Sequence, residues 1–333
     1  MKNSIAVIGG GGIGKRHLQS LSYLDRHTDI FLVDPSLESL EIARDLFEST
    51  ARLTNSSARH KLTGMSEISH LPKDLDLCIV ATCADVRYEV VVSLLNTSRI
   101  KNLVLEKILF QQLEHYGEVQ SLFEKFNVKS WVNCPLRGVE PYRGIKDSLN
   151  GVKPIRMEVS GRNWGLASNS VHFLDLFEFY TNSSISEKLD LELVTAYQTD
   201  RRHGRSPFFE YFGTLRASND HGDEIVLDCK SDPTCEKNFV IQLMTKESSF
   251  VVEYVPHLVR YSHRDGARVV AATHDEVMQS ELTHEVVNSI LDAGEVDIPT
   301  YSEATNSHIL LLKCLIGSHN KFFKVEDDIA RIT

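Results

Sequence analysis

The sequence has no run of about 18 consecutive apolar residues, so it contains no candidate transmembrane helix. It also lacks a signal-peptide layout, because its first residues lead directly into a strand-like segment. The six cysteines form no CxxC pair and the histidines no HExxH motif, so we expect neither a metal site nor a redox dithiol. These absences favour a cytoplasmic protein with reduced thiols and no membrane partner.

An excess of basic residues is missing as well. The chain has 46 acidic residues against 36 Lys and Arg, which gives a formal net charge of −10. A nucleic-acid-binding protein needs a basic surface, so we expect no nucleic-acid partner. Hydrophobic residues make up 42% and charged residues 25% of the 333 positions, which is ordinary for a globular protein of about two domains.

A glycine-rich motif stands between a predicted strand, residues 5–8, and a helical run that begins at Lys15. Its glycines have the spacing GxGxxG, which in this context is typical of a dinucleotide-binding turn. The first glycine allows the tight turn, the second lets the backbone approach a pyrophosphate, and the third lets helix and strand pack closely. The helix N-terminus then offers N–H groups to the phosphates. We predict that the cofactor contacts Gly9, Gly11, Gly12, Ile13 and Gly14.

An acidic residue ends the second predicted strand. Asp34 follows the apolar residues 30–33 and lies 20 residues after Gly14. A dinucleotide-binding fold places at this point the carboxylate that accepts hydrogen bonds from a ribose diol. Because a carboxylate repels a 2′-phosphate, Asp34 favours NAD over NADP. A glycine turn followed by a solvated Asp explains the same residues without a ligand, but the combined context and spacing favour the cofactor site.

Strand-like and helical segments alternate up to residue 133 and predict an α/β domain with a doubly wound parallel sheet of the Rossmann type. A junction rich in Pro and Gly follows at 135–144. Beyond it, β-rich runs with little helix between them predict an α+β domain, residues 134–333, with a mostly antiparallel sheet. Helices are expected near 169–180, 274–293 and 302–317, and the last of them could pack back on the first domain.

This organisation resembles the Gfo/Idh/MocA family of NAD(P)-dependent oxidoreductases over nearly the whole chain. Residues 7–17 look like the family's opening, and Glu106-Lys107 resembles the first two residues of its EKP motif. His172 and Asp175 resemble the end of its pattern of Asp, three residues, His, two residues, Asp. Similar segments also occur at Arg137, at 141–142 and at 298–304.

Three positions depart from the family's pattern. Ile108 stands where the EKP motif has proline, Arg87 where a loop histidine is common, and Ser168 where many relatives carry a catalytic Asp. The first departure affects the local backbone, whereas the third bears on proton transfer.

The resemblance implies that Ala81, Thr82, Glu106 and Lys107 line the nicotinamide side of the cofactor site. Lys107 follows a parallel strand, where such sheets bind ligands, and a desolvated Lys can exchange a proton. A surface Lys paired with Glu106 is the alternative.

A second catalytic set is expected on one helix face, because Ser168, His172 and Asp175 are spaced i, i+4 and i+7. His172 would be the acid/base group by its ordinary pKa of about 6.5. Asp175 would orient the imidazole, and Ser168 would donate to the substrate or relay a proton. A histidine that only packs in the core is the alternative.

We place Arg137, Asn163, Trp164 and Arg202 at the substrate. A Trp offers an apolar face to a sugar ring, although a core Trp with a capping Asn fits equally well. Arg202 belongs to a basic set at 201–205, which suits a carboxylate or phosphate on the substrate or forms a solvated loop.

The sequence therefore predicts hydride transfer between NAD and a hydroxyl-bearing carbon of a sugar, sugar acid, nucleotide sugar or cyclitol. Two alternatives stay open. One is retained-NAD chemistry, such as epimerisation, elimination or glycoside hydrolysis; the other is a non-catalytic NAD-binding regulator, which the Ser168 departure supports. The resemblance also implies a homodimer or homotetramer that assembles through an open sheet face.

Overall fold

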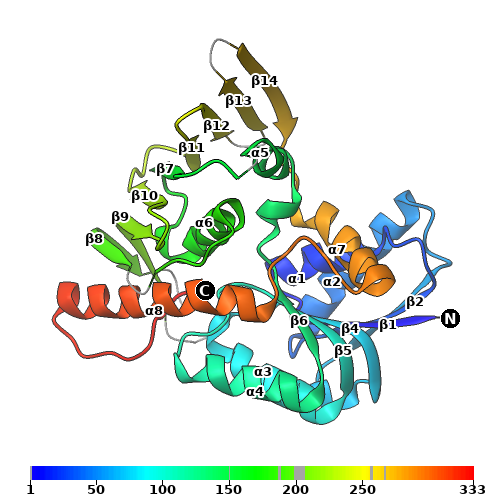
Figure 1. The fold of residues 1–333 in the computed structure, drawn as a ribbon. Helices are drawn as coiled ribbons and strands as arrows, with labels where there is room; N and C mark the ends of the chain where they lie inside the picture. The colour runs from blue at the N-terminus through cyan, green and yellow to red at the C-terminus, as the bar shows by residue number, and fades with distance from the viewer. Residues whose placement is uncertain (1, 150, 187–188, 199–206, 256–257, 266–267) are drawn as a thin grey trace. The chain divides into compact units, whose positions relative to one another are not determined.

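The computed structural model describes residues 2–149, 151–186, 189–198, 207–255, 258–265 and 268–333 (Figure 1). The chain divides into two compact units. Unit 1 comprises Met1–Phe110, Glu114–Asn133 and Val277–Ser302, and unit 2 comprises Gln111–Leu113, Cys134–Glu276 and Glu303–Thr333. The sequence-based division placed all residues after 133 in the second domain, whereas in the structure residues 277–302 belong to unit 1.

Unit 1 contains a six-stranded parallel sheet of order β3-β2-β1-β4-β5-β6, which confirms the predicted doubly wound fold. The central strands β1 and β4 end in runs of buried apolar residues, because both faces of such a sheet are covered by helices. The strands are β1 (Asn3–Ile8), β2 (Thr28–Val33), β3 (His60–Met65), β4 (Asp74–Val80), β5 (Arg99–Leu105) and β6 (Lys129–Val132). The helices between them are α1 (Gly12–Leu21), α2 (Leu37–Leu53), the short η1 (Ile68–His70), α3 (Ala84–Thr97) and α4 (Glu114–Phe126).

Helix α7 (Gln279–Ala293) completes the core of unit 1. It packs against α1, and Figure 1 shows the two helices side by side, α7 in orange and α1 in blue. Val287 and Ile290 of α7 join the same apolar cluster as Leu18 and Leu21 of α1. The packing explains why this late segment belongs to the N-terminal unit: its apolar stripe has its partner there.

Unit 2 contains an eight-stranded sheet of order β14-β13-β12-β11-β7-β10-β9-β8, in which only the pair β7–β10 is parallel among the described pairings. This confirms the predicted mostly antiparallel sheet. The strands are β7 (Arg156–Arg162), β8 (Asp190–Gln198), β9 (Phe209–Ser218), β10 (Glu224–Lys230), β11 (Asn238–Met244), β12 (Ser248–Val255), β13 (Leu258–Asp265) and β14 (Arg268–Asp275). The other elements are η2 (Pro135–Gly138), α5 (Tyr142–Leu149), α6 (Leu166–Thr181) and most of α8 (Tyr301–Phe323).

Helix α6 is the part of unit 2 that carries the predicted catalytic residues. It contacts β9, β10 and η2, and it is apolar almost all round, with Val171, Leu174 and Phe177 fully buried. A helix of this kind is a core element, so its few polar side chains need partners inside the protein. No helix among the described residues is both long and apolar enough to span a membrane.

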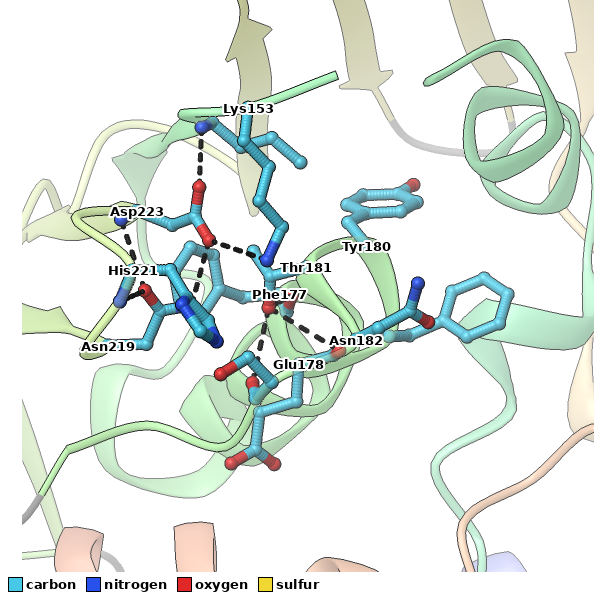
Figure 2. A network of polar contacts seen from close by, with 12 residues as sticks. Lys153, Phe177, Glu178, Tyr180, Thr181, Asn182, Asn219, His221 and Asp223 are labelled. Carbon is cyan, nitrogen blue, oxygen red and sulfur yellow. Dashed lines mark hydrogen bonds and ion pairs between the residues drawn. The ribbon is translucent and has the colours of Figure 1, made fainter. Parts of the chain in front are cut away.

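A buried carboxylate aligns the two parallel strands of unit 2 (Figure 2). Asp223, at the start of β10, accepts hydrogen bonds from the backbone N–H of Ile155 at 2.7 Å and from the side-chain amide of Asn219 at 2.9 Å. The ammonium group of Lys153 lies 3.5 Å from the same carboxylate. These contacts join the segment before β7 to the turn before β10, and they thereby set the register of the two strands.

The packing of α7 predicts a stability effect that is confined to unit 1. Each unit has one of the chain's two Trp residues, Trp131 in unit 1 and Trp164 in unit 2, so a Trp164→Phe background leaves a fluorescent probe of unit 1 alone. In that background we expect Val287→Ala to lower the free energy of unfolding in urea by about 2 kcal/mol, because it leaves a cavity in the core. Glu285→Ala, an exposed change on the same helix, should alter it by less than about 0.5 kcal/mol. Equal stabilities of the two variants would contradict the packing.

Candidate functional site

The turn between β1 and α1 has no room for side chains at two of its glycines. A Cβ atom on Gly14 would lie 1.8 Å from the carbonyl oxygen of Gly9. Gly9 itself has a φ of +100°, and a Cβ there would lie 3.0 Å from the carbonyl oxygen of Ala81. The first turn of α1 therefore lies directly on the ends of β1 and β4, which only glycine permits.

The N-terminus of α1 faces open space. Gly11 is the N-cap, and no side chain caps the helix. A Cβ on Gly11 or Gly12 would meet no atom within 4 Å, so the backbone there can be approached closely. The N–H groups of the first turn and the positive end of the helix dipole suit a phosphate group at this point. The predicted contacts from Gly9 to Gly14 thus fit a pyrophosphate.

Asp34 is held beside this turn by two backbone groups. One carboxylate oxygen accepts a hydrogen bond from the N–H of Gly10 at 2.7 Å, and the other accepts from the N–H of Ser36 at 2.8 Å. Each carboxylate oxygen has a further lone pair, so both can still accept from the hydroxyls of a ribose diol. The structure brings Asp34 and the glycine turn together as the sequence spacing indicates.

Ala81 and Thr82 follow β4, next to the glycine turn. The N–H of Ala81 donates to the carbonyl of Ile8 at the end of β1, with a length of 2.8 Å. Because β1 lies between β2 and β4, the strand order reverses at this edge, which is where doubly wound sheets bind their ligands. The predicted cofactor residues of β1, β2 and β4 therefore share one sheet edge.

Arg87 clamps two loops at the same edge of unit 1. Its side chain is only 1% exposed, and it donates to the carbonyls of Thr82, Ile108 and Leu109. Burial lowers the pKa of Arg87 to about 10, so the guanidinium stays charged at neutral pH. The clamp ties the loop after β4 to the segment that follows Lys107. Sequence analysis noted Arg87 only as a departure from a family pattern. Its role as a clamp was not visible in the sequence, because two of the three carbonyl groups that it binds lie more than 20 residues away in the chain.

Glu106 is the centre of a buried polar network in unit 1. Its carboxylate accepts from Nε2 of His17 at 2.8 Å and from the side-chain amide of Asn133 at 2.5 Å. His17 Nδ1 lies 2.8 Å from the hydroxyl of Thr283, and Asn133 also donates to Gln279 at 2.9 Å. Because an ionised carboxylate only accepts hydrogen bonds, Nε2 of His17 carries a proton. The network joins α1, α7 and β6 to the end of β5.

The charge on Glu106 is stabilised despite its burial. Burial alone raises the pKa of a carboxyl group, but the hydrogen bond and charge of His17, the charge of Lys107 and the bond from Asn133 outweigh it and lower the pKa to about 2. Lys107 is half-buried next to this carboxylate, and its peptide bond to Ile108 is cis. The predicted cofactor and proton-transfer roles of Glu106 and Lys107 stay predictions.

In unit 2, Ser168 lies in the first turn of α6 and is bonded to a carboxylate from another strand. Its hydroxyl donates to Glu210 of β9 at 2.6 Å. The same carboxylate accepts from the N–H groups of Ala167 at 2.6 Å and Tyr211 at 3.0 Å, and more weakly from that of Ser168 at 3.4 Å. Glu210 thus caps α6 from outside the helix. Burial raises the pKa of Glu210, and these hydrogen bonds oppose the rise.

His172 and Asp175 occupy the same helix as Ser168, as predicted. His172 is half-buried, whereas Asp175 is buried and forms an ion pair with Arg137, which donates to both of its oxygens. Burial raises the pKa of Asp175 to about 6, although Arg137 opposes the shift. Arg137, predicted to contact substrate, thus has a partner inside unit 2. That Asp175 orients His172 stays a prediction.

A cavity of about 470 Å³ opens beside the first turn of α6, wholly within unit 2. Three predicted residues line it: Asn163, Trp164 and Ser168. Trp164 is 1% exposed and donates from its indole N–H to the carbonyl of Asp228 at 3.0 Å, so it forms part of the core. Asn163 bonds to the backbone of Asp232 and does not cap a helix. Arg202 lies outside the described residues.

Sequence reasoning missed several members of these sites. Glu210 had one usable signal: it is a carboxylate between pairs of aromatic residues, at 208–209 and 211–212, and a buried charge needs partners. His17 stands one turn after Gly14, but its partners lie far away in the chain. No sequence pattern marks Asn133, Gln279 or Thr283. They come together only because residues 277–302 pack in unit 1 of the folded protein. Within the described residues, no group of three or more His, Cys, Asp or Glu could hold a metal ion.

The glycine turn, the uncapped helix end and the carboxylate of Asp34 together define a nucleotide-binding Rossmann domain joined to an α+β domain. Residues 3–134 match the sequence model of the oxidoreductase family with an NAD-binding Rossmann fold, GFO_IDH_MocA. Over this domain, which is less than half of the chain, the sequence is therefore similar to the Gfo/Idh/MocA oxidoreductases. No curated protein matched the chain as a sequence relative.

Solved structures share the fold over almost the full chain. The super-repressor mutant of Gal80p from Saccharomyces cerevisiae is 16% identical, with 97% of each chain covered and a TM-score of 0.71. An oxidoreductase from Agrobacterium radiobacter, solved with NAD⁺, L-tartaric acid and magnesium, is 12% identical, with 93% of this chain and 94% of that one covered and a TM-score of 0.70. UDP-N-acetylglucosamine 3-dehydrogenase from Acidithiobacillus ferrooxidans is 12% identical, with 94% of this chain and 97% of that one covered and a TM-score of 0.68. At these identities the likeness concerns the fold.

The Arg87 clamp predicts a large loss of stability when the guanidinium is removed. Arg87→Met should lower the free energy of unfolding of unit 1 by about 3 kcal/mol, because three carbonyl groups lose their buried donor. The Trp164→Phe background again supplies the probe. Arg52→Met is the matched control, since the Arg52 side chain is 67% exposed, and it should cost less than about 0.5 kcal/mol. A similar small cost at position 87 would show that the clamp does not form.

Glu178, a second carboxylate on α6, predicts that the free energy of unfolding of unit 2 depends on pH. Burial raises the pKa of Glu178 to about 7, and the charge of Asp175 adds to the rise. A carboxyl group whose folded pKa is raised favours folding below its ordinary pKa, and this contribution is lost as the pH rises through 7. Glu178→Gln should therefore flatten the decline of unfolding free energy between pH 5 and pH 8 by up to about 3 kcal/mol. Trp164 fluorescence in a Trp131→Phe background measures it.

The control for this pH profile is Glu224→Gln, which replaces an exposed carboxylate of β10 with a side chain 58% exposed. Its profile should follow that of the parent protein. A Glu178→Gln profile as steep as the parent's would mean that Glu178 ionises normally in the folded protein.

Proposed function

We propose that this chain is an NAD-dependent oxidoreductase that transfers a hydride between the nicotinamide and a hydroxyl-bearing carbon of a sugar, sugar acid, nucleotide sugar or cyclitol. The observation that carries the proposal is the geometry around Gly11 and Asp34. An open backbone approach and an uncapped helix end stand beside a carboxylate that can accept from a ribose diol. The family's description as NAD-binding supports the same conclusion.

The preference for NAD over NADP rests on Asp34. Its carboxylate is fixed at the end of β2 by the N–H groups of Gly10 and Ser36, so it cannot swing away from an incoming group. A 2′-phosphate at this position would meet a negative charge, whereas a 2′-hydroxyl would donate a hydrogen bond to it. The Agrobacterium radiobacter structure with bound NAD⁺ is consistent with this choice.

Lys107 and His172 are the proposed acid/base pair. When bound, the nicotinamide would accept or supply the hydride. Lys107 is half-buried beside the ionised Glu106, which favours its charged form and a hydrogen bond to the reacting oxygen. His172 would take or return the hydroxyl proton, because its ordinary pKa of about 6.5 suits that task near neutral pH.

One observation supports a second candidate function. Position 168 carries serine in place of the family's Asp, and its hydroxyl is engaged by Glu210. A chain that had lost its proton-transfer group could keep NAD as a signal, and Gal80p from Kluyveromyces lactis, a second structural neighbour of that name, is described as a transcriptional regulator. An NAD-binding regulator is therefore the alternative to the enzyme.

The deciding experiment follows the absorbance of reduced nicotinamide with purified protein, NAD and pooled cyclitols, free sugars, sugar acids or nucleotide sugars. We expect a rise in one pool, and a rate at least about 100-fold lower for Lys107→Ala, since general acid–base groups contribute factors of that size. Lys73→Ala, an exposed lysine before β4, should keep the parent rate. If the absorbance rises in none of the pools although NAD is bound, the result would favour retained-NAD chemistry or the NAD-binding regulator.

A further inference from the structure

The sheet of unit 2 ends in two edge strands of different character, β8 and β14 (Figure 1). The pairing of β8 with β9 has a register shift between Leu193 and Thr195, and β8 exposes the acidic residues Asp190 and Glu192. A bulge and exposed charges both hinder an edge strand from pairing with a further strand. β8 therefore has the features of a protected edge.

β14 has none of these protective features. It comprises the eight residues Arg268–Asp275, contains no Pro, Gly or Lys, and pairs with β13 in one continuous register. Val269 is 58% exposed and Val270 41% exposed, and the two side chains lie on opposite faces because they are consecutive in a strand. Among the described strands none pairs with the outer edge of β14, so this edge can accept the backbone of another strand.

Two exposed charges lie on the same face of the sheet as Val269. Arg264 of β13 is paired in register with Val269, and Asp275 lies six residues further along β14. Within the described part of the chain, neither Arg264 nor Asp275 has an ion-pair partner. Six residues of strand span about 20 Å, so the two charges cannot meet within one copy of the chain.

A second copy of the chain brings these charges together. When two β14 strands pair antiparallel about a two-fold axis at Ala272, Val269 lies opposite Asp275 of the second copy. Because Arg264 flanks Val269 on its other side, Arg264, Val269 and Asp275 of the second copy form one row across three strands. The two ends of this row are about 10 Å apart, which an Arg side chain lying over Val269 can bridge to a carboxylate.

The charges also select this register over its neighbour. A two-fold axis at Ala271 would place Thr273 opposite Val269, and Arg264 would then have no carboxylate in its row. A two-fold interface repeats each of its contacts, so the register at Ala272 forms the Arg264–Asp275 pair twice. Arg264 and Asp275 therefore complement a second copy of this chain in one register.

We propose that β14 is a homodimer interface, which pairs antiparallel with β14 of a second copy about Ala272, so that Arg264 of each copy meets Asp275 of the other. Backbone hydrogen bonds would join the two sheets, and the paired charges would fix the register. The proposal is independent of the proposed function. It names the edge of the sheet, whereas the resemblance implied assembly through the open face.

The test is a charge exchange, followed by sedimentation of the full chain at micromolar concentrations. The parent protein should form a dimer that dissociates on dilution. Arg264→Glu and Asp275→Arg each place like charges in one row, so each should weaken dimerisation at least about tenfold. The double variant restores opposite charges and should recover the parent affinity. All other charges are the same in the four proteins, so the comparison isolates this pair.

Glu192→Arg is the control, because it reverses a charge on β8, the protected edge of the same sheet, where the side chain is 75% exposed. It should dimerise like the parent. Hydrogen exchange locates the contact: the amides of residues 268–275 should exchange more slowly as the concentration of the parent or the double variant rises. In the two single variants this protection should be lost.

Three results would overturn the proposal. The first is a parent protein that stays monomeric over the whole concentration range. The second is a dimer that neither single variant weakens, which would place the interface elsewhere, for example on the open face. The third is a double variant that dimerises as poorly as the single variants, which would show that Arg264 and Asp275 do not meet. Both positions are exposed, so all variants should unfold at the temperature of the parent monomer.

Discussion

The approach of the α1 backbone to the ends of β1 and β4 is the constraint on which the cofactor site depends. Gly14 touches the carbonyl of Gly9 so closely that a single methyl group would push helix and strand apart. This contact directs the first turn of α1 over the sheet edge, and Gly10, in the turn just before the helix, donates its N–H to Asp34. A nucleotide site of this kind is made mainly by the backbone, and Asp34 adds one carboxylate to it.

Buried carboxylates with different partners set the local chemistry of the two units. In unit 1, hydrogen bonds from His17 and Asn133 stabilise the ionised form of Glu106, which precedes Lys107 in the chain. In unit 2, Glu210 caps α6 and holds Ser168, while Asp175 pairs with Arg137. Each is buried only because hydrogen bonds replace the water that it lost. Ser168 and Asp175 of α6 are therefore bonded to residues of neighbouring elements. Any role of these two side chains in proton transfer would involve those partners as well.

Much of the fold was predictable from local sequence, because apolar periodicity and glycine spacing report strand, turn and helix directly. The parallel sheet, the mainly antiparallel sheet, the glycine turn and Asp34 all followed from such signals. The return of residues 277–302 did not, since which apolar face α7 packs on depends on the folded surface of α1. Glu210 was missed for the same reason: its partner Ser168 is 42 residues away in the chain.

The most direct measurement is a calorimetric titration of the purified protein with NAD⁺ and, separately, with NADP⁺. The account predicts that NAD⁺ binds and that NADP⁺ binds at least about tenfold more weakly, because the fixed carboxylate of Asp34 meets the 2′-phosphate. Asp34→Ala should bring the two affinities together. Tighter binding of NADP⁺ would contradict the role of Asp34, and no binding of either cofactor would contradict the site itself.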